Sequence, residues 1–195
     1  MNIRPDGVYV DVTFGGGGHS REIMSRLGEN GKLFAFDQDL DALNNAIDDE
    51  RFTLINENFR FIKRFLRFHG IKQVDGILAD LGVSSHQFDV AERGFSTRFD
   101  AELDMRMNQK GDISAYHVVN EYDEQDIARV LFDYGELKNA RAMANVIVTA
   151  RKDKEIRNSD ELKKVLAKFL PGHKSNKILA QIYQAIRIEV NQEMD

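Results

Sequence analysis

Three acidic residues and a run of glycines are spaced as in a site for a ligand that carries a ribose. Asp11 lies within an alternating strand pattern, Val8–Val12, that leads into four consecutive glycines, Gly15–Gly18. Asp37 closes the next apolar run about twenty residues later, where a carboxylate can accept hydrogen bonds from both ribose hydroxyls. Asp80 closes a further apolar run. Because parallel strands end at one edge of a sheet, we expect these groups to line a common site.

The glycine loop distinguishes between the two common ligands of such a site, NAD and S-adenosyl-L-methionine. A dinucleotide loop needs a third glycine, where this sequence has Ser20 or Arg21, depending on whether the pattern starts at Gly15 or Gly16. Asp11 would repel a pyrophosphate but is able to hold the ammonium group of a methionine moiety. The residues therefore favour S-adenosyl-L-methionine, and the alternative is a tight turn without a ligand.

Length and composition restrict the class of protein. The chain has 195 residues, 42% of them hydrophobic, which suffices for one sizeable domain or a domain with an insertion. It lacks cysteine, so it has neither a disulfide framework nor a thiolate metal site, and we expect no metal. It also lacks an apolar run long enough to span a bilayer. We expect a cytoplasmic protein that does not associate with membranes.

The first part of the chain alternates strand and helix patterns. Further strands are expected at Phe52–Ile55 and Val74–Asp80, and helical spacing covers residues 21–27, 39–47 and 61–68. This order predicts an α/β fold with a Rossmann-like parallel sheet. Phe59 follows the third strand, where it either lies over a bound adenine or belongs to the core.

After Val83 the alternation stops, and the pattern predicts a mostly helical insertion. We expect residues 1–84 and 176–195 to form the core, with a final helix at 177–190, and residues 85–175 to form the insertion. From Lys138 to Lys177 eleven basic residues stand against four acidic ones, although the whole chain has a net charge of −5. Such a stretch either binds phosphates or forms solvated helix faces. Its basic centre contains Arg151, Lys152, Lys154 and Arg157.

Several long blocks resemble the MraW/RsmH family. The most specific are 11–20 (DVTFGGGGHS), 75–85 (DGILADLGVSS) and 91–96 (AERGFS), and shorter similarities lie at 103–107, 134–136 and 184–191. The resemblance runs from end to end. It implies a Rossmann-like methyltransferase that uses S-adenosyl-L-methionine to methylate the exocyclic N4 amine of a cytosine in 16S rRNA of the small ribosomal subunit. The insertion would then be the RNA-recognition domain.

The resemblance also assigns roles to residues. The cofactor contacts that it implies are Gly17, Gly18, His19, Asp37, Phe59, Asp80 and Gln87. The amine of cytosine is a weak nucleophile, because its lone pair is delocalised into the ring. Asp80 is placed to accept its N–H and to stabilise the positive charge that develops, and Ser84 or Ser85 could hold the base edge.

The sequence departs from the family pattern at three places. Val12 replaces a glycine, His86 stands where many members have proline, and both ends of a member are missing, including the C-terminal strands. Roughly two thirds of a member is present. We therefore also weigh an inactive fragment that binds cofactor or RNA, and a methyltransferase acting on a small molecule or a protein. Without a fifth strand, we expect the fourth strand to self-associate or to be covered by the terminal helix.

Overall fold

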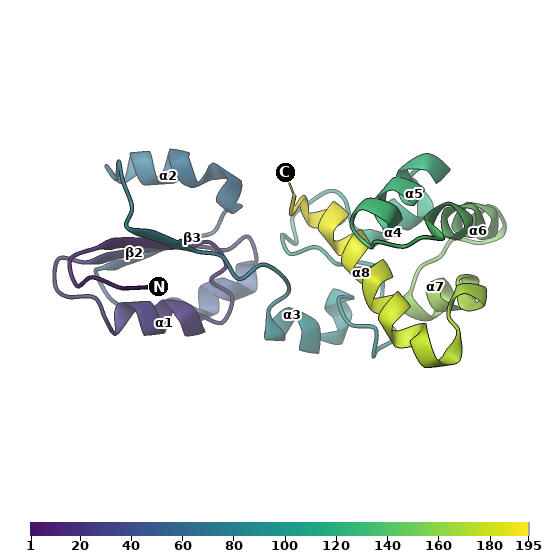
Figure 1. Cartoon of the computed structure of the whole chain (residues 1–195), viewed down its shortest axis with the longest axis horizontal. Coiled ribbons are helices and arrows are strands. Elements are labelled where there is room, and N and C mark those ends of the chain that lie inside the picture. Colours follow the sequence, from purple (N-terminus) through teal and green to yellow (C-terminus); the bar gives the residue numbers. More distant parts are fainter. Residues whose placement is uncertain (195) are drawn as a thin grey trace. The chain divides into compact units, whose positions relative to one another are not determined.

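The computed structural model describes residues 1–194, and the chain divides into two compact units, Met1–His86 and Gln87–Asp195. The first unit contains a sheet with flanking helices, and the second consists of helices joined by irregular segments (Figure 1). Within residues 1–194 no helix combines the length and the apolar character needed to cross a membrane.

A four-stranded sheet, all of whose strands are parallel, forms the centre of the first unit. Its strands are β1 (Val8–Asp11), β2 (Lys32–Phe36), β3 (Phe52–Ile55) and β4 (Gly76–Leu78), in the order β3-β2-β1-β4. Asp11 at the end of β1 aligns with Ala35 of β2 and with Leu78 of β4. The sheet confirms the predicted Rossmann-like α/β fold.

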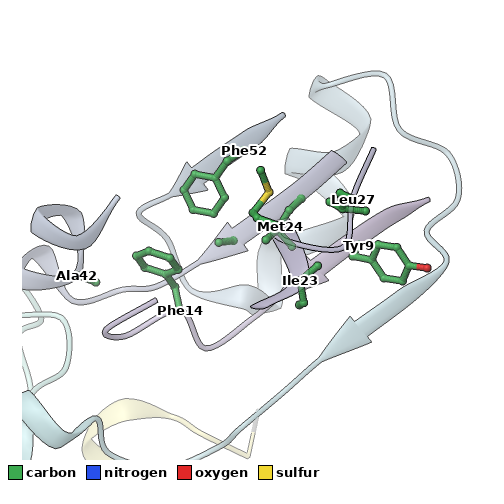
Figure 2. Close-up of a cluster of buried hydrophobic side chains, with 9 residues drawn as sticks. Tyr9, Phe14, Ile23, Met24, Leu27, Ala42 and Phe52 are labelled. Carbon is green, nitrogen blue, oxygen red and sulfur yellow. The ribbon is translucent and has the colours of Figure 1, made fainter. Parts of the chain in front are cut away.

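Strands β1 and β2 are buried on both faces of the sheet, and their alternate side chains point to opposite sides. One face contributes Tyr9, Leu33 and Ala35, which pack with Phe14 and with Ile23 of helix α1 (Gly18–Met24) (Figure 2). The other face buries the intervening side chains of β1 and β2, namely Val10, Phe34 and Phe36. The half-buried Ile62, Phe65 and Leu66 of helix α2 (Ile62–Phe68) cover that second face. Helices on both faces are what an all-parallel sheet requires.

The segment expected to form a helix over residues 39–47 is a 3-10 helix, η1 (Leu40–Asn45). Asp39 caps its start by accepting a hydrogen bond from the Asp41 N–H at 3.1 Å. A second 3-10 turn, η2 (Phe59–Phe61), precedes α2 and is capped by Asn58. Short polar caps therefore set where both segments begin.

Strand β4 is shorter than the predicted Val74–Asp80 and lies at one edge of the sheet. Among the described strands it pairs only with β1, and its residue Ile77 is 54% exposed to solvent. An open edge with unpaired backbone groups can recruit another strand. Self-association through this edge stays a prediction.

The second unit is a helical assembly that begins within α3 (Ser85–Asp89). Its other helices are η3 (Ala91–Arg93), α4 (Ala115–Asn120), α5 (Glu124–Asp133), α6 (Ala140–Asp153), α7 (Ser159–Val165), η4 (Ala167–Phe169), η5 (Gly172–Lys174) and α8 (Ser175–Asn191). The helical character expected for residues 85–175 is confirmed. Helix α8 packs against α4 and α5 inside this unit. The assignment of residues 176–195 to the methyltransferase core, and with it the predicted boundaries, remains a prediction.

The buried Asn191 joins the C-terminal end of α8 to an irregular loop of the same unit. Its Oδ1 accepts from the Met107 N–H at 2.6 Å, and its Nδ2 donates to the carbonyls of Met105 at 2.8 Å and Arg187 at 2.9 Å. Met105 has a positive φ of 58° and is fully buried, so its carbonyl depends on this partner.

Replacing Asn191 by alanine should therefore destabilise the second unit. Asn191→Ala leaves a buried N–H and a buried carbonyl unpaired, and we expect a loss of about 1–3 kcal/mol in the free energy of unfolding. Urea denaturation followed by circular dichroism measures it. Asn176→Ala is the control, because Asn176 lies exposed on the same helix. An equal change in both variants would contradict the role given to Asn191.

Candidate functional site

The carboxyl ends of β1, β2 and β4 bring the predicted groups to one edge of the sheet. The glycine loop follows β1, Asp37 directly follows β2, and Asp80 lies two residues beyond β4. The Gly15 N–H donates to Asp37 Oδ2 at 2.7 Å, so the loop and the second strand meet in space. The Asp80 N–H donates to Thr13 Oγ1 at 2.8 Å, which joins the fourth strand to the same loop.

Two side chains hold the glycine loop from outside. Asn45 donates through Nδ2 to the Gly15 carbonyl at 3.2 Å, and Arg21 donates to the Gly16 carbonyl at 2.6 Å. Arg21 also donates to the Asn45 carbonyl at 2.9 Å, so the two are linked. The sequence did not predict these contacts, because they depend on η1 folding back against the loop.

The four glycines of the loop differ in backbone conformation and surroundings. Gly15 and Gly17 have positive φ values of 49° and 75°, which favour glycine. A Cβ at Gly17 would also lie 2.9 Å from the Phe14 ring. At Gly16 and Gly18, by contrast, a Cβ would meet no protein atom within 4 Å. The chain's own packing does not require glycine at these two positions, and they leave open space beside the loop.

Asp37 is half-buried, and backbone groups hold both of its oxygens. Oδ2 accepts from Gly15, and Oδ1 accepts from the Asp39 N–H at 2.9 Å. Burial raises the pKa of the Asp37 carboxyl above its ordinary value, although the two backbone N–H groups partly offset this. Each oxygen keeps a second lone pair, so the oriented carboxylate can still accept hydrogen bonds from a ligand.

The Asp11 carboxylate makes its hydrogen bonds to groups of the chain itself. It is fully buried, and its oxygens accept from the Thr13 N–H at 3.0 Å and from Ser20 Oγ at 2.8 Å. It therefore presents no surface to a ligand, and the expectation that it holds an ammonium group is wrong. Thr13 was not singled out from the sequence, yet its hydroxyl lies 3.4 Å from Asp11 Oδ1 and accepts from the Asp80 N–H.

The side chains of His19 and Asp80 are exposed and meet, with His19 Nε2 lying 3.3 Å from Asp80 Oδ2. Ser84 lies beside the loop, since a Cβ at Gly15 would be 3.4 Å from the Ser84 Cβ. Ser85 is exposed and starts α3. Within residues 1–194 no group of three or more acidic or histidine side chains could hold a metal ion.

The two remaining predicted residues differ in their surroundings. Phe59 is half-buried at the start of η2 and packs against the cluster around Phe34 and Phe36, so part of its ring belongs to the core. Gln87 is buried and belongs to the second unit. The roles that the resemblance implied for both stay predictions.

The basic centre of residues 138–177 is largely engaged within the chain. Arg151 donates to the carbonyls of Val119 at 2.7 Å and Tyr122 at 2.5 Å, so it ties α6 to the end of α4. Lys154 and Arg157 pair with acidic neighbours, which lowers the pKa of Glu161 and of Glu155 respectively. Of the four residues that the sequence pointed to, only Lys152 makes no such contact with a described residue. These contacts within the chain favour the alternative of solvated helix faces for this centre, and phosphate binding by it stays a prediction.

This fold defines the class of the protein: it is a Rossmann-like α/β protein, and its candidate ligand site consists of a glycine loop and carboxylates that follow the strands. The family model described as the MraW methylase family matches residues 1–195, and the chain belongs to this family.

The chain is similar to proteins named ribosomal RNA small subunit methyltransferase H. It is 78% identical to that of Flavobacterium johnsoniae, with all of the chain and 65% of the relative covered. It is 72% identical to that of Flavobacterium psychrophilum, with all of the chain and 67% of the relative covered. The chain thus spans about two thirds of the length of these relatives. A solved structure titled as a putative rRNA-methylase from Clostridium thermocellum is 25% identical over 42% of the chain and 46% of that structure, and its TM-score of 0.38 carries no structural argument.

The difference between the glycines can be tested on stability alone. Gly17→Ala should lower the free energy of unfolding by about 1–2 kcal/mol, because a left-handed alanine is strained and its Cβ meets the Phe14 ring. Gly18→Ala, at the first residue of α1, should leave stability unchanged or slightly higher. Thermal unfolding of both variants decides, and a loss of similar size in Gly18→Ala would refute the open space at that position.

Proposed function

We propose that this protein methylates the exocyclic N4 amine of a cytosine in 16S rRNA, with S-adenosyl-L-methionine as the methyl donor. The observation that carries the proposal is the edge at which the open glycine loop, Asp37 and Asp80 converge in a chain of the MraW methylase family. The names of the relatives support a small-subunit rRNA substrate. The choice of N4 of cytosine rests on the family resemblance of the motifs. The proposed place of action is the cytoplasm, where small ribosomal subunits are found.

The residues present fit S-adenosyl-L-methionine better than a dinucleotide. Gly16 and Gly18 leave a cradle without side chains, and Asp37 is oriented to accept ribose hydroxyls. Ser20 occupies the place of the third glycine in a dinucleotide loop, and it is buried against Asp11. We assign Gly17, Gly18, His19, Asp37, Phe59, Asp80 and Gln87 to cofactor binding. When bound, the cofactor supplies an electrophilic methyl group.

In the proposed reaction Asp80 accepts a hydrogen bond from the cytosine amine. This draws electron density toward the nitrogen and stabilises the positive charge that develops as the nitrogen attacks. Thr13 holds the backbone of Asp80, and His19 contacts its carboxylate, so both orient the acceptor. Ser84 and Ser85 follow in the same segment and are assigned to the base edge. The base must leave its stack to reach such a site.

Ribose binding by Asp37 should depend on pH. A ribose hydroxyl donates to the ionised carboxylate, whereas a protonated Asp37 loses acceptor capacity. Because the pKa of Asp37 is raised, affinity for S-adenosyl-L-methionine should begin to fall at a higher pH than for an ordinary aspartate with pKa of about 3.9. Calorimetric titration at a series of pH values, from neutral pH into the acid range, measures where this fall begins.

Asp37→Asn should weaken binding about tenfold or more and remove this pH dependence, since a hydrogen bond to a charged acceptor is worth about 1.5–3 kcal/mol. Asp48→Asn is the control, because Asp48 is an exposed acid after η1. Tighter binding of NAD than of S-adenosyl-L-methionine would rule out the cofactor assignment.

Asp80→Asn should lower methyl transfer by about a hundredfold or more, as expected when one charge-stabilising group is lost. The assay follows tritium from labelled S-adenosyl-L-methionine into undermethylated small ribosomal subunits, with cofactor affinity measured in parallel. Asp6→Asn makes the same chemical change before the opposite end of β1 and should leave transfer intact. A loss that only follows cofactor affinity would make Asp80 a binding residue, and no transfer by the wild-type protein would reject the proposed function.

A further inference from the structure

Helix α2 and the turn before it form a basic surface in the first unit. Residues 58–73 contain five basic residues and no acidic one, although the whole chain has 32 acidic against 27 basic residues. The five are Arg60, Lys63, Arg64, Arg67 and Lys72, and all are exposed. We call these residues, with Phe61 and Phe68, the α2 surface.

The packing of α2 explains why its cations face outward. Ile62, Phe65 and Leu66 contact the buried cluster on one face of the sheet. Figure 1 shows α2 lying along the sheet on the side opposite to α1. On a helix, residues three or four apart share a face, so Arg67 lies on the same outer side of α2 as Lys63 and Arg64.

Four of these five cations are not neutralised by the described part of the chain. Lys63, Arg64, Arg67 and Lys72 form no ion pair with any residue of the described range 1–194. The basic centre in the second unit differs, since Lys154 and Arg157 there pair with acidic neighbours. Burying several unpaired cations against another protein surface would be costly, whereas a row of phosphates would neutralise them.

Two aromatic side chains interrupt the basic surface. Phe68 is 84% exposed and Phe61 is 37% exposed, although other phenylalanines of this segment pack inward. The Arg60 guanidinium lies 4.8 Å from the centre of the Phe61 ring. Exposed rings beside basic groups are the combination with which proteins stack unpaired bases while holding the backbone.

The α2 surface starts next to the candidate site. Phe59 and Arg60 belong to η2, which begins directly after the Asn58 cap at the carboxyl end of β3. The Asn58 Nδ2 donates to Gln38 Oε1 at 3.4 Å, which links this turn to the residue after Asp37. A strand of RNA on the α2 surface would therefore lead toward the edge that carries the candidate site.

We propose that the α2 surface binds single-stranded RNA next to the target base, through phosphate contacts to its cations and stacking on Phe61 and Phe68. This rests on the proposed function and adds a substrate-binding surface outside the helical unit. A membrane surface is a poorer ligand for α2 than RNA, because a helix that lies on a bilayer buries its apolar face in the lipid. In α2 that face is occupied by the sheet.

The test compares two triple variants with the same change in charge. Lys63→Gln/Arg64→Gln/Arg67→Gln should bind a short single-stranded RNA of mixed sequence about tenfold or more weakly at low salt. The slope of log affinity against log salt should become shallower by roughly 2, since each phosphate contact on a single strand contributes about 0.7. Arg26→Gln/Lys32→Gln/Lys110→Gln is the control, because these residues are also exposed and lie elsewhere. Phe68→Ala should weaken binding about fivefold or more with an unchanged salt slope.

The outcomes separate this proposal from the proposed function. Affinity for S-adenosyl-L-methionine should be equal in all variants, which also shows that they are folded. Equal RNA affinities and salt slopes in the two triple variants would overturn the proposal. So would a variant that loses binding to phosphatidylserine vesicles but keeps its affinity for RNA. If the wild-type protein fails to methylate small subunits while the two triple variants still differ in RNA affinity, the proposed function is rejected and RNA binding by the α2 surface is retained.

Discussion

The buried carboxylate of Asp11 is the interaction on which the candidate site depends. It accepts hydrogen bonds from the loop at Thr13 and from α1 at Ser20, so one side chain fixes both the turn and the helix that follows it. A buried carboxylate is costly unless it is satisfied by such donors, and this requirement restrains the loop. Through the Thr13 hydroxyl the same network reaches the backbone of Asp80 at the end of another strand.

The parallel sheet brings the groups held by this network together at one edge. Its strands end at the same edge, and the register places the end of β1 between those of β2 and β4. Helices bury both faces of the sheet, which leaves the edge as the place where polar groups can meet a ligand. The backbone at Gly15 and Gly17 turns with positive φ, and the space beside Gly16 and Gly18 stays clear. The open space beside the loop and the oriented carboxylate oxygens therefore lie at the same edge of the sheet.

Charge is distributed differently from what a count along the chain indicates. The stretch from Lys138 to Lys177 has the larger basic excess, yet Arg151 caps backbone carbonyls and its neighbours Lys154 and Arg157 pair with acids. The shorter segment of α2 has fewer cations but no acid to pair with them. A partner with closely spaced phosphates gains affinity mainly from cations that are not paired within the protein, because these cations neutralise phosphates and release their counterions.

The sequence by itself determined the parts of this protein that depend on neighbours in the chain. Alternating apolar residues predicted β1, short apolar stretches predicted β2 and β3, and helical spacing predicted α2 and α8, because such patterns are complete within a few residues. The order of these elements sufficed to bring Asp37 and Asp80 to one edge. Only the tertiary structure decided that Asp11 is buried and satisfied within the chain, that Asn45 and Arg21 hold the loop, and which basic side chains are paired. The partners in these contacts lie on other elements or beyond the reach of a local pattern, so their pairing is settled by packing and desolvation rather than by spacing along the chain.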